Sequence, residues 1–439
     1  MLIHLIKNDT KFRNFVFLKT IYYLGFMIKF EKFILDNGLK VIVHQDNSSP
    51  IVAFNVLYNV GAKDENPEKT GFAHLFEHLM FGGSENIPKY DEPLERVGGE
   101  NNAFTNSDFT NYYLTLPLQS IETAFWLESD RMNQLAFSEK SLDVQRNVVS
   151  EEFKQVYLNQ PYGDAWLLLK PLAYKVHPYQ WNTIGKKIEH VQNATMEDVK
   201  DFFSRFYNPN NAILVIAGNV EVEEMKTLTE KWFGSIPKGP ENLRTLPIEP
   251  KQTEGRKQKV ENDVPFDVIY KAYHMCARKD ENYHATDLVS DILSNGKSSR
   301  LYENLIEKQK LFSDINAYLS GDIEEGLFVV KGKLVKGVAM EVAEAAIIEQ
   351  LELVKSNLID EKELQKVKNK IESTLVFSEI SNLNKAMNLA YYELLGDAAM
   401  VNDEPENYRN VTAQQIKDQA NLIFREENCS TLYYYSKTK

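Results

Sequence analysis

His74-Leu75-Phe76-Glu77-His78 is the stretch of this sequence that most restricts its structure and its chemistry. An α-helix has about 3.6 residues per turn, so side chains four residues apart lie on one face, roughly 6 Å apart along the axis. His74 and His78 therefore point in the same direction, with the Glu77 carboxylate beside them. The surrounding residues are apolar, and two imidazoles and a carboxylate in such a setting need partners. A bound metal ion would satisfy all three, so the stretch predicts a helix that carries a metal site.

A second acidic helix is expected over residues 141–157, and it offers a further metal ligand. Zinc commonly takes three protein ligands and leaves a fourth position for water. Glu152 shares a helical face with three valines, Val148, Val149 and Val156. That face is expected to be the buried one, so Glu152 is the predicted third ligand. Glu151 lies on a wetter face and is expected either to support a ligand from outside the metal shell or to lie on the surface.

These residue types predict hydrolysis. The order His-x-x-Glu-His reverses the His-Glu-x-x-His motif of many zinc proteases. One zinc ion per chain, held by His74, His78 and Glu152, would lower the pKa of a water toward about 7 and polarise a carbonyl. Glu77 is placed to take the proton from that water and return it to a leaving amine. The alternative is a pair of surface histidines on an amphipathic helix.

Length and charge narrow the classes of protein further. A chain of 439 residues is expected to form two domains. The net charge of −13, without any basic run, argues against a nucleic-acid partner. Cys276 and Cys429 are far apart and outside any Cys-x-x-Cys pattern, which fits a reducing, cytoplasmic location.

Residues 1–26 are predicted to be an extension outside the folded domains. Their apolar run is interrupted by Lys19, is too short to span a membrane, and is not followed by a cleavage signal. The regular fold is expected to start at Met27. The alternative is that residues 1–26 act as a signal or anchor, which would make the protein periplasmic or exported.

An internal repeat predicts two homologous domains. The helix expected to start at Thr195 leads to Asn211 and an apolar strand, and the helix expected to start at Thr412 leads to Asn428 and another strand. The two segments are offset by 217 residues throughout.

The predicted domains are residues 27–236, which carry the metal motif, and residues 261–439, which lack it. The proline-rich, charged stretch 237–260 is expected to link them. Each domain mixes strands with long amphipathic helices. The predicted class is therefore α+β, with two mostly antiparallel sheets and helices packed on one face of each.

The sequence resembles the pitrilysin and insulin-degrading-enzyme family, which includes the mitochondrial processing peptidases. In that family the histidine motif is followed some seventy-odd residues later by a glutamate ligand, and Glu152 lies 74 residues after His78. The resemblance covers nearly everything from Met27 onward and is carried by residues 71–83, 98–105, 110–113, 181–185, 207–211 and 299–302. It implies a zinc metalloendopeptidase that cleaves extended peptides or small unfolded polypeptides. It also implies that this chain forms half of a clam-like chamber.

The resemblance also implies where the substrate binds. The strand equivalent to Asn102, Ala103 and Phe104 borders the active site in the family and pairs with the extended substrate. A sheet edge can add a peptide strand through main-chain hydrogen bonds, so this role is physically reasonable. The alternative is an ordinary turn and strand without substrate contact.

Three positions depart from the family pattern. Gln145 stands where the family has a glutamate that supports the metal ligands, and Ile306 and Ser313 stand where active members have an arginine and a tyrosine that hold substrate. We therefore expect a heterodimer in which a related chain supplies the missing pair, with a homodimer as the other possibility. The competing functions are a non-catalytic or weakly active subunit of a family complex, and a protease that removes leader peptides.

Overall fold

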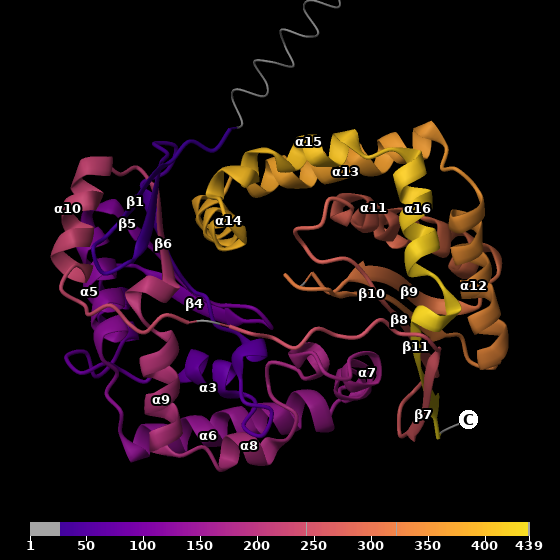
Figure 1. Ribbon diagram of the computed structural model, residues 1–439, viewed down its shortest axis with the longest axis horizontal. Helices are drawn as coiled ribbons and strands as arrows, with labels where there is room; N and C mark the ends of the chain where they lie inside the picture. The colour runs from indigo at the N-terminus through magenta and orange to yellow at the C-terminus, as the bar shows by residue number, and fades with distance from the viewer. Residues whose placement is uncertain (1–26, 243, 322, 438–439) are drawn as a thin grey trace, which may run out of the picture.

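The computed structural model describes residues 27–437 with the exception of residues 243 and 322. The predicted N-terminal extension, residues 1–26, lies outside the described residues. Two domains face each other across the molecule, and each is a sheet covered by helices (Figure 1). The predicted α+β class with two such domains is confirmed. No helix in the described part of the chain is long and apolar enough to cross a membrane.

The N-terminal sheet has six strands in the order β1-β2-β6-β3-β5-β4. They are β1 (Glu31–Ile34), β2 (Lys40–Gln45), β3 (Ile51–Tyr58), β4 (Glu100–Thr105), β5 (Thr110–Pro117) and β6 (Ala212–Gly218). Only β2 and β6 run parallel; the other neighbours are antiparallel. β4 ends the sheet, so one row of its backbone N–H and C=O groups has no strand partner among the described residues.

The C-terminal sheet repeats this topology with five strands in the order β7-β11-β8-β10-β9. They are β7 (Arg256–Asn262), β8 (Val268–His274), β9 (Phe312–Leu319), β10 (Leu327–Leu334) and β11 (Cys429–Ser436). β7 and β11 are parallel, like β2 and β6, and the remaining pairs are antiparallel.

Helices surround both sheets. The N-terminal domain contains α3 (Phe72–Leu79), α4 (Asp91–Arg96), α5 (Ile121–Asn133), α6 (Glu139–Phe153), α7 (Ala165–Ala173), α8 (Ile188–Gln192), α9 (Met196–Phe206) and α10 (Val222–Phe233). The C-terminal domain contains α11 (Tyr283–Ser294), α12 (Met340–Ser356), α13 (Glu361–Ser378), α14 (Asn382–Leu395), α15 (Glu404–Asn410) and α16 (Ala413–Ile423). A π-helical turn, Lys154–Leu158, follows α6 directly, and another, Tyr302–Lys308, follows α11.

The predicted repeat is confirmed in atomic detail. α9 and α16 each begin after a threonine, Thr195 or Thr412, whose hydroxyl accepts from the backbone three residues later in a capping box. After each helix an asparagine amide donates to the carbonyl five residues before it, Asn211 to Phe206 and Asn428 to Ile423. The matched threonines and asparagines are 217 residues apart, so the two domains are copies of one structural unit.

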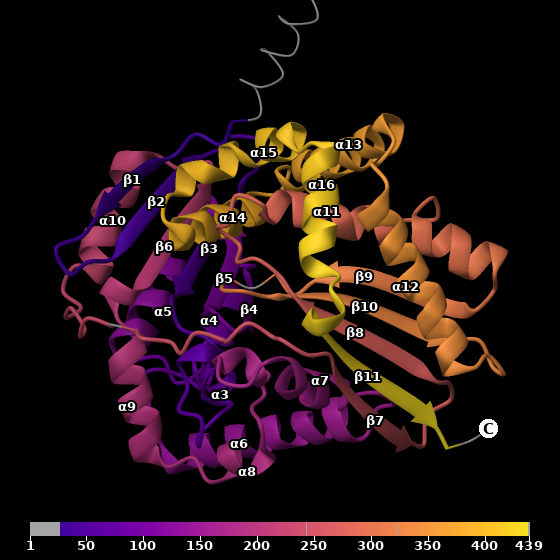
Figure 2. The same cartoon turned by 45° about the vertical axis from the view of Figure 1, so that its right-hand side comes forward.

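Each sheet has a second covering helix that belongs to the other domain. α14 packs on the N-terminal sheet, where Leu389 and Ala390 bury against Leu57 and Val215. α7 packs in the equivalent way on the C-terminal sheet, beside β8 and β11 (Figures 1 and 2). Because both faces are covered, β6 is buried at every residue. The helices on one face were predicted, and the exchanged helices on the other were not.

The predicted linker, residues 237–260, is too long at its C-terminal end. β7 begins at Arg256 and pairs in parallel with β11 along its whole length. Its sequence, Arg-Lys-Gln-Lys-Val-Glu-Asn, resembles a charged linker because β7 is an edge strand whose alternate residues are exposed. The stretch before Arg256 is irregular, and it crosses between the domains (Figure 1).

Candidate active site

The helix that carries the histidine motif, α3, starts at a left-handed glycine. Gly71 has φ of 91°, and a Cβ there would lie 2.7 Å from the carbonyl oxygen of Ile184. The buried Glu65 carboxylate accepts hydrogen bonds from the backbone N–H of Gly71 at 2.9 Å and of Ala73 at 2.8 Å. Trp181 Nε1 donates to the same carboxylate at 3.1 Å. Burial raises the pKa of Glu65 to about 8, against the effect of these three donors.

Thr70, the residue before Gly71, does not cap this helix with its side chain. The Thr70 hydroxyl instead lies 2.8 Å from His190 Nδ1 and accepts from the backbone N–H of Lys186 at 2.8 Å. Glu65, which caps the helix instead, lies six residues before Gly71. This separation is beyond the range of the local sequence patterns that mark helix starts.

Three predicted ligands converge on one point. His74 Nε2 lies 3.6 Å and His78 Nε2 lies 3.4 Å from the same oxygen of Glu152, Oε2. In the described part of the chain these are the residues whose spacing could hold a metal ion, with ligand atoms all within 4.8 Å of one another. Tetrahedral zinc with bonds of about 2.0–2.2 Å needs ligand atoms roughly 3.3 Å apart. The arrangement fits such an ion with little movement.

The protonation states of His74 and Glu152 also suit a cation. Burial lowers the pKa of His74, which keeps its ring neutral and its lone pair available near pH 7. A hydrogen bond from His78 lowers the pKa of Glu152, which keeps the carboxylate ionised. Neutral imidazoles and an ionised carboxylate are the forms that bind divalent metals.

Glu77 lies beside the ligands with its own partner. Its Oε2 accepts a hydrogen bond of 2.6 Å from the Thr105 hydroxyl at the end of β4. This contact joins α3 to the edge strand of the sheet, and it orients a carboxylate beside the candidate ligands. The sequence offered no reason to select Thr105, because the contact spans 28 residues.

Asn102, Ala103 and Phe104 lie on β4, at the free edge of the N-terminal sheet and next to α3. Their side chains alternate between exposed and half-buried, as in a strand with one open face. The Asn102 side chain accepts from the backbone N–H of Ala103, and the Phe104 ring contacts Phe109. The position is suitable for strand pairing with a substrate, and direct contact stays a prediction.

Glu152 is on the predicted helix, but only one of the three valines expected on its buried face is buried. Val149 is buried, whereas Val148 and Val156 are 44% and 40% exposed. Glu152 therefore lies at the border between the packed and the open side of α6, where it can contact both α3 and solvent.

In the part of the chain that the structure describes, the two candidates for supporting roles form no hydrogen bond or ion pair with the candidate ligands. Glu151 is exposed and forms an ion pair of 2.6 Å with Lys154, so the surface alternative describes it. Gln145 lies two turns before Glu152 on α6 and is half-buried. Neither has a hydrogen bond to His74 or His78 among the described residues.

Comparison with known proteins identifies the family. Residues 40–173 match the family described as Insulinase (Peptidase family M16), and residues 193–371 match the Peptidase M16 inactive domain. The chain belongs to peptidase family M16. The first match includes the histidine motif and Glu152, and the second begins just before α9 and extends into the C-terminal repeat, which lacks this motif.

A relative of similar length aligns over nearly the whole chain, and another aligns over less than half of it. The zinc protease PqqE of Helicobacter pylori is 29% identical over 93% of this chain and 93% of its own length. The mitochondrial-processing peptidase subunit beta of Saccharomyces cerevisiae is 26% identical over 46% of this chain and 44% of its own. These names place zinc and proteolysis in the family.

Solved structures confirm the fold. A protease from Helicobacter pylori superposes with a TM-score of 0.87 at 28% identity, covering 93% of this chain and all of that one. Pitrilysin matches with a TM-score of 0.74 at 20% identity, over 93% of this chain and 45% of the pitrilysin chain. This chain therefore spans about half the length of pitrilysin.

Proposed function

We propose that this M16 member is a zinc metalloendopeptidase, with the metal held by His74, His78 and Glu152 and with Glu77 as general base. The observation that carries the proposal is the convergence of both imidazole Nε2 atoms on one Glu152 oxygen, with the Glu77 carboxylate beside them. A scaffold protein has no need of these four side chains, because it costs free energy to bring polar groups together in a half-buried site without a ligand.

Zinc, when bound, supplies Lewis acidity that polarises a peptide carbonyl and acidifies water. Glu77 would take the proton from the attacking water and deliver it to the leaving amine. Thr105 holds one oxygen of Glu77 by a hydrogen bond, which restricts the rotation of the carboxylate. The free edge of β4 would align an extended peptide beside these groups through main-chain hydrogen bonds.

Zinc quantification and peptidase assays on the wild type and on Glu77→Gln test this proposal. We expect one zinc ion in both proteins, and a loss of hydrolysis of about 100-fold or more in the variant, because general-base catalysis contributes on this scale. Hydrolysis at the wild-type rate in Glu77→Gln would contradict the role of Glu77. A wild type that binds zinc but cleaves no peptide, alone or with a partner, would favour the non-catalytic alternative.

We further propose that a second, related chain completes the enzyme. Ile306 is packed against the C-terminal core, and the Ser313 hydroxyl donates to the Lys333 carbonyl. Neither side chain offers the guanidinium or phenol that the family resemblance leads us to expect at these positions. The chain spans about half the length of pitrilysin, and one relative is named as a subunit, which supports an enzyme built from two such chains.

Activity of the purified chain with and without a related partner chain tests the pairing. We expect weak hydrolysis by the chain alone and a clear gain on addition of the partner. Full activity of a homodimer would contradict the need for a different second chain.

A further inference from the structure

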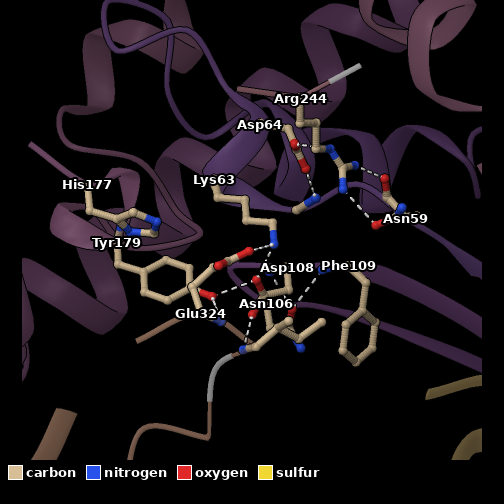
Figure 3. A network of polar contacts seen from close by, with 12 residues as sticks. Asn59, Lys63, Asp64, Asn106, Asp108, Phe109, His177, Tyr179, Arg244 and Glu324 are labelled. Atoms are coloured by element: carbon tan, nitrogen blue, oxygen red, sulfur yellow. Dashed lines mark hydrogen bonds and ion pairs between the residues drawn. The ribbon is translucent and has the colours of Figure 1, made fainter. Parts of the chain in front are cut away.

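Residues 107–109, in the turn between β4 and β5, are buried, and the turn is hydrogen-bonded to the C-terminal domain through Asp108. Figure 3 shows Asp108 within a network of polar contacts that includes Lys63, Tyr179 and Glu324. The Asp108 side chain is only 2% exposed. The Asp108 carboxylate has three partners: Lys63 Nζ at 2.7 Å, the Tyr179 hydroxyl at 2.6 Å and the backbone N–H of Ile323 at 3.0 Å. One carboxylate therefore joins a segment before the metal helix, a loop after α7 and the C-terminal domain.

The C-terminal partner is the 323–325 segment, which lies between β9 and β10. Besides the Ile323 N–H, the Glu324 N–H donates to the Tyr179 hydroxyl at 3.0 Å, and the Glu325 carbonyl accepts from Tyr174 at 3.0 Å. Glu324 also lies 3.3 Å from Lys63 Nζ, but its side chain is 45% exposed. Backbone groups thus make most of these contacts, so the docked position of the segment depends on the groups that receive it.

The turn that carries Asp108 has little freedom to move by itself. Asn106 Oδ1 accepts from the N–H of Asp108 at 2.8 Å and of Phe109 at 2.9 Å. The Lys63 N–H donates to the Ser107 carbonyl at 2.8 Å. A movement of Asp108 would therefore displace the whole turn, including the adjoining end of β4.

The end of β4 is Thr105, which holds Glu77. Thr105 is three residues from Asp108 and pairs with Thr110 across the hairpin. Its hydroxyl donates to Glu77 at 2.6 Å. The 323–325 segment, Asp108, Thr105 and Glu77 thus form one continuous series of hydrogen bonds and rigid backbone.

We propose that Asp108 is a positioning residue through which docking of the C-terminal domain sets the orientation of Glu77. This inference rests on the proposed peptidase function. With the 323–325 segment docked, Asp108 holds the turn and Thr105 holds the carboxylate. Without it, Asp108 loses the Ile323 N–H, and the turn and Thr105 can move away from Glu77. The domain without a metal motif thereby contributes to the geometry of the base.

The central test is a double-mutant cycle on Asp108→Asn and Thr105→Val. Both variants are expected to retain zinc and to lower kcat by about 10- to 100-fold, because small misplacements of a catalytic group cost this much. KM should change less than kcat, since the metal ligands are unaltered. The double variant should lose no more than the more damaging single one, because both act through the same contact. Fully additive losses would overturn the proposal.

Asp287→Asn is the matched control for a purely structural effect. Asp287 accepts a hydrogen bond of 2.6 Å from Tyr408, so it resembles Asp108 in its contact with Tyr179, but it lies on α11 in the C-terminal domain. We expect it to lower stability without changing kcat. Equal losses of kcat in Asp287→Asn and Asp108→Asn would reduce Asp108 to a structural role. If Asp108→Asn does not fold, Tyr179→Phe removes one of its hydrogen bonds while keeping the Lys63–Asp108 charges paired, and should lower kcat several-fold.

Amide hydrogen exchange separates this proposal from the proposed function. Asp108→Asn is expected to speed exchange in residues 100–110 and in the 323–325 segment together, whether or not the protein cleaves peptides. Unchanged exchange in residues 100–110 would overturn the positioning role even if the wild type is an active peptidase. If the wild type does not hydrolyse peptides, the proposed function is overturned. The exchange result alone then decides whether Asp108 couples the 323–325 segment to residues 100–110.

Discussion

Replacement of Glu65 by alanine is expected to weaken the metal site without touching a ligand. The Glu65 carboxylate accepts hydrogen bonds from the backbone N–H groups of Gly71 and Ala73 at the start of α3. Ala73 directly precedes His74. Alanine removes both acceptor oxygens whatever their protonation state. The start of α3 would then have two buried donors without partners, and the position of His74 would no longer be held.

The expected loss of stability in Glu65→Ala comes from the buried donors that lose their acceptor. Each buried backbone N–H left unsatisfied costs about 1–3 kcal/mol, so Gly71 and Ala73 together cost about 2–6 kcal/mol. Trp181 loses one acceptor but keeps the Ala62 carbonyl at 2.9 Å, so it adds little. The expected loss is a large part of the stability of an ordinary domain, about 5–15 kcal/mol.

Urea unfolding and zinc competition against a chromophoric chelator measure the two effects. We expect Glu65→Ala to unfold at lower urea and to bind zinc at least about tenfold more weakly, which corresponds to 1.4 kcal/mol. Asp360→Ala is the matched control, because Asp360 caps α13 by accepting from Lys362 N–H at an exposed site. It should cost about 1 kcal/mol and leave zinc affinity unchanged. A Glu65→Ala protein with wild-type unfolding and wild-type zinc affinity would refute the capping argument.

Two further predictions concern charge. Glu152→Gln is expected to lose zinc while the neighbouring Glu151→Gln keeps it, because Glu151 is exposed and pairs with Lys154 at the surface. Equal zinc content in both variants would contradict the ligand assignment. Burial opposes ionisation of Glu404, but the His284 hydrogen bond and the Arg278 charge outweigh it and lower its pKa to about 2 from 4.5. Ionised Glu404 should therefore stabilise the folded state by about 3 kcal/mol above pH 4.5, and this contribution should disappear as the pH falls toward 2. In Glu404→Gln, the free energy of unfolding measured with urea should fall less steeply over this pH range.

The grouping of His74, His78 and Glu152 could be predicted in part, because the two histidines are close in sequence and Glu152 lies on a helix that the sequence indicates. His74 and His78 are one turn apart, and Glu152 was selected from its own helix. The duplication was equally accessible, since capping residues such as Thr195 and Thr412 keep a constant offset.

The contacts that the sequence did not predict join segments that are far apart in the chain. Glu65 caps α3 from outside it, Thr105 reaches Glu77 only after the sheet forms, and Asp108 meets Ile323 only after the two domains dock. The predicted linker included residues 256–260 of β7, because the strand that stabilises β7, β11, lies at the other end of the domain. Such residues carry no periodic pattern, so only the folded structure identifies them.

The exchange of α7 and α14 between the two sheets bears on how the chain arose by duplication. A protein with only one repeat would carry one such helix, and in this chain each helix covers the sheet of the other repeat. A protein with one repeat could cover its sheet by lending the helix to a second copy and receiving the copy's helix in return, as in a domain-swapped dimer. Fusion of the two genes would turn this exchange between molecules into contacts within one chain. The high effective concentration of the tethered halves then makes the pairing independent of protein abundance, and it leaves the second copy free to lose its metal ligands.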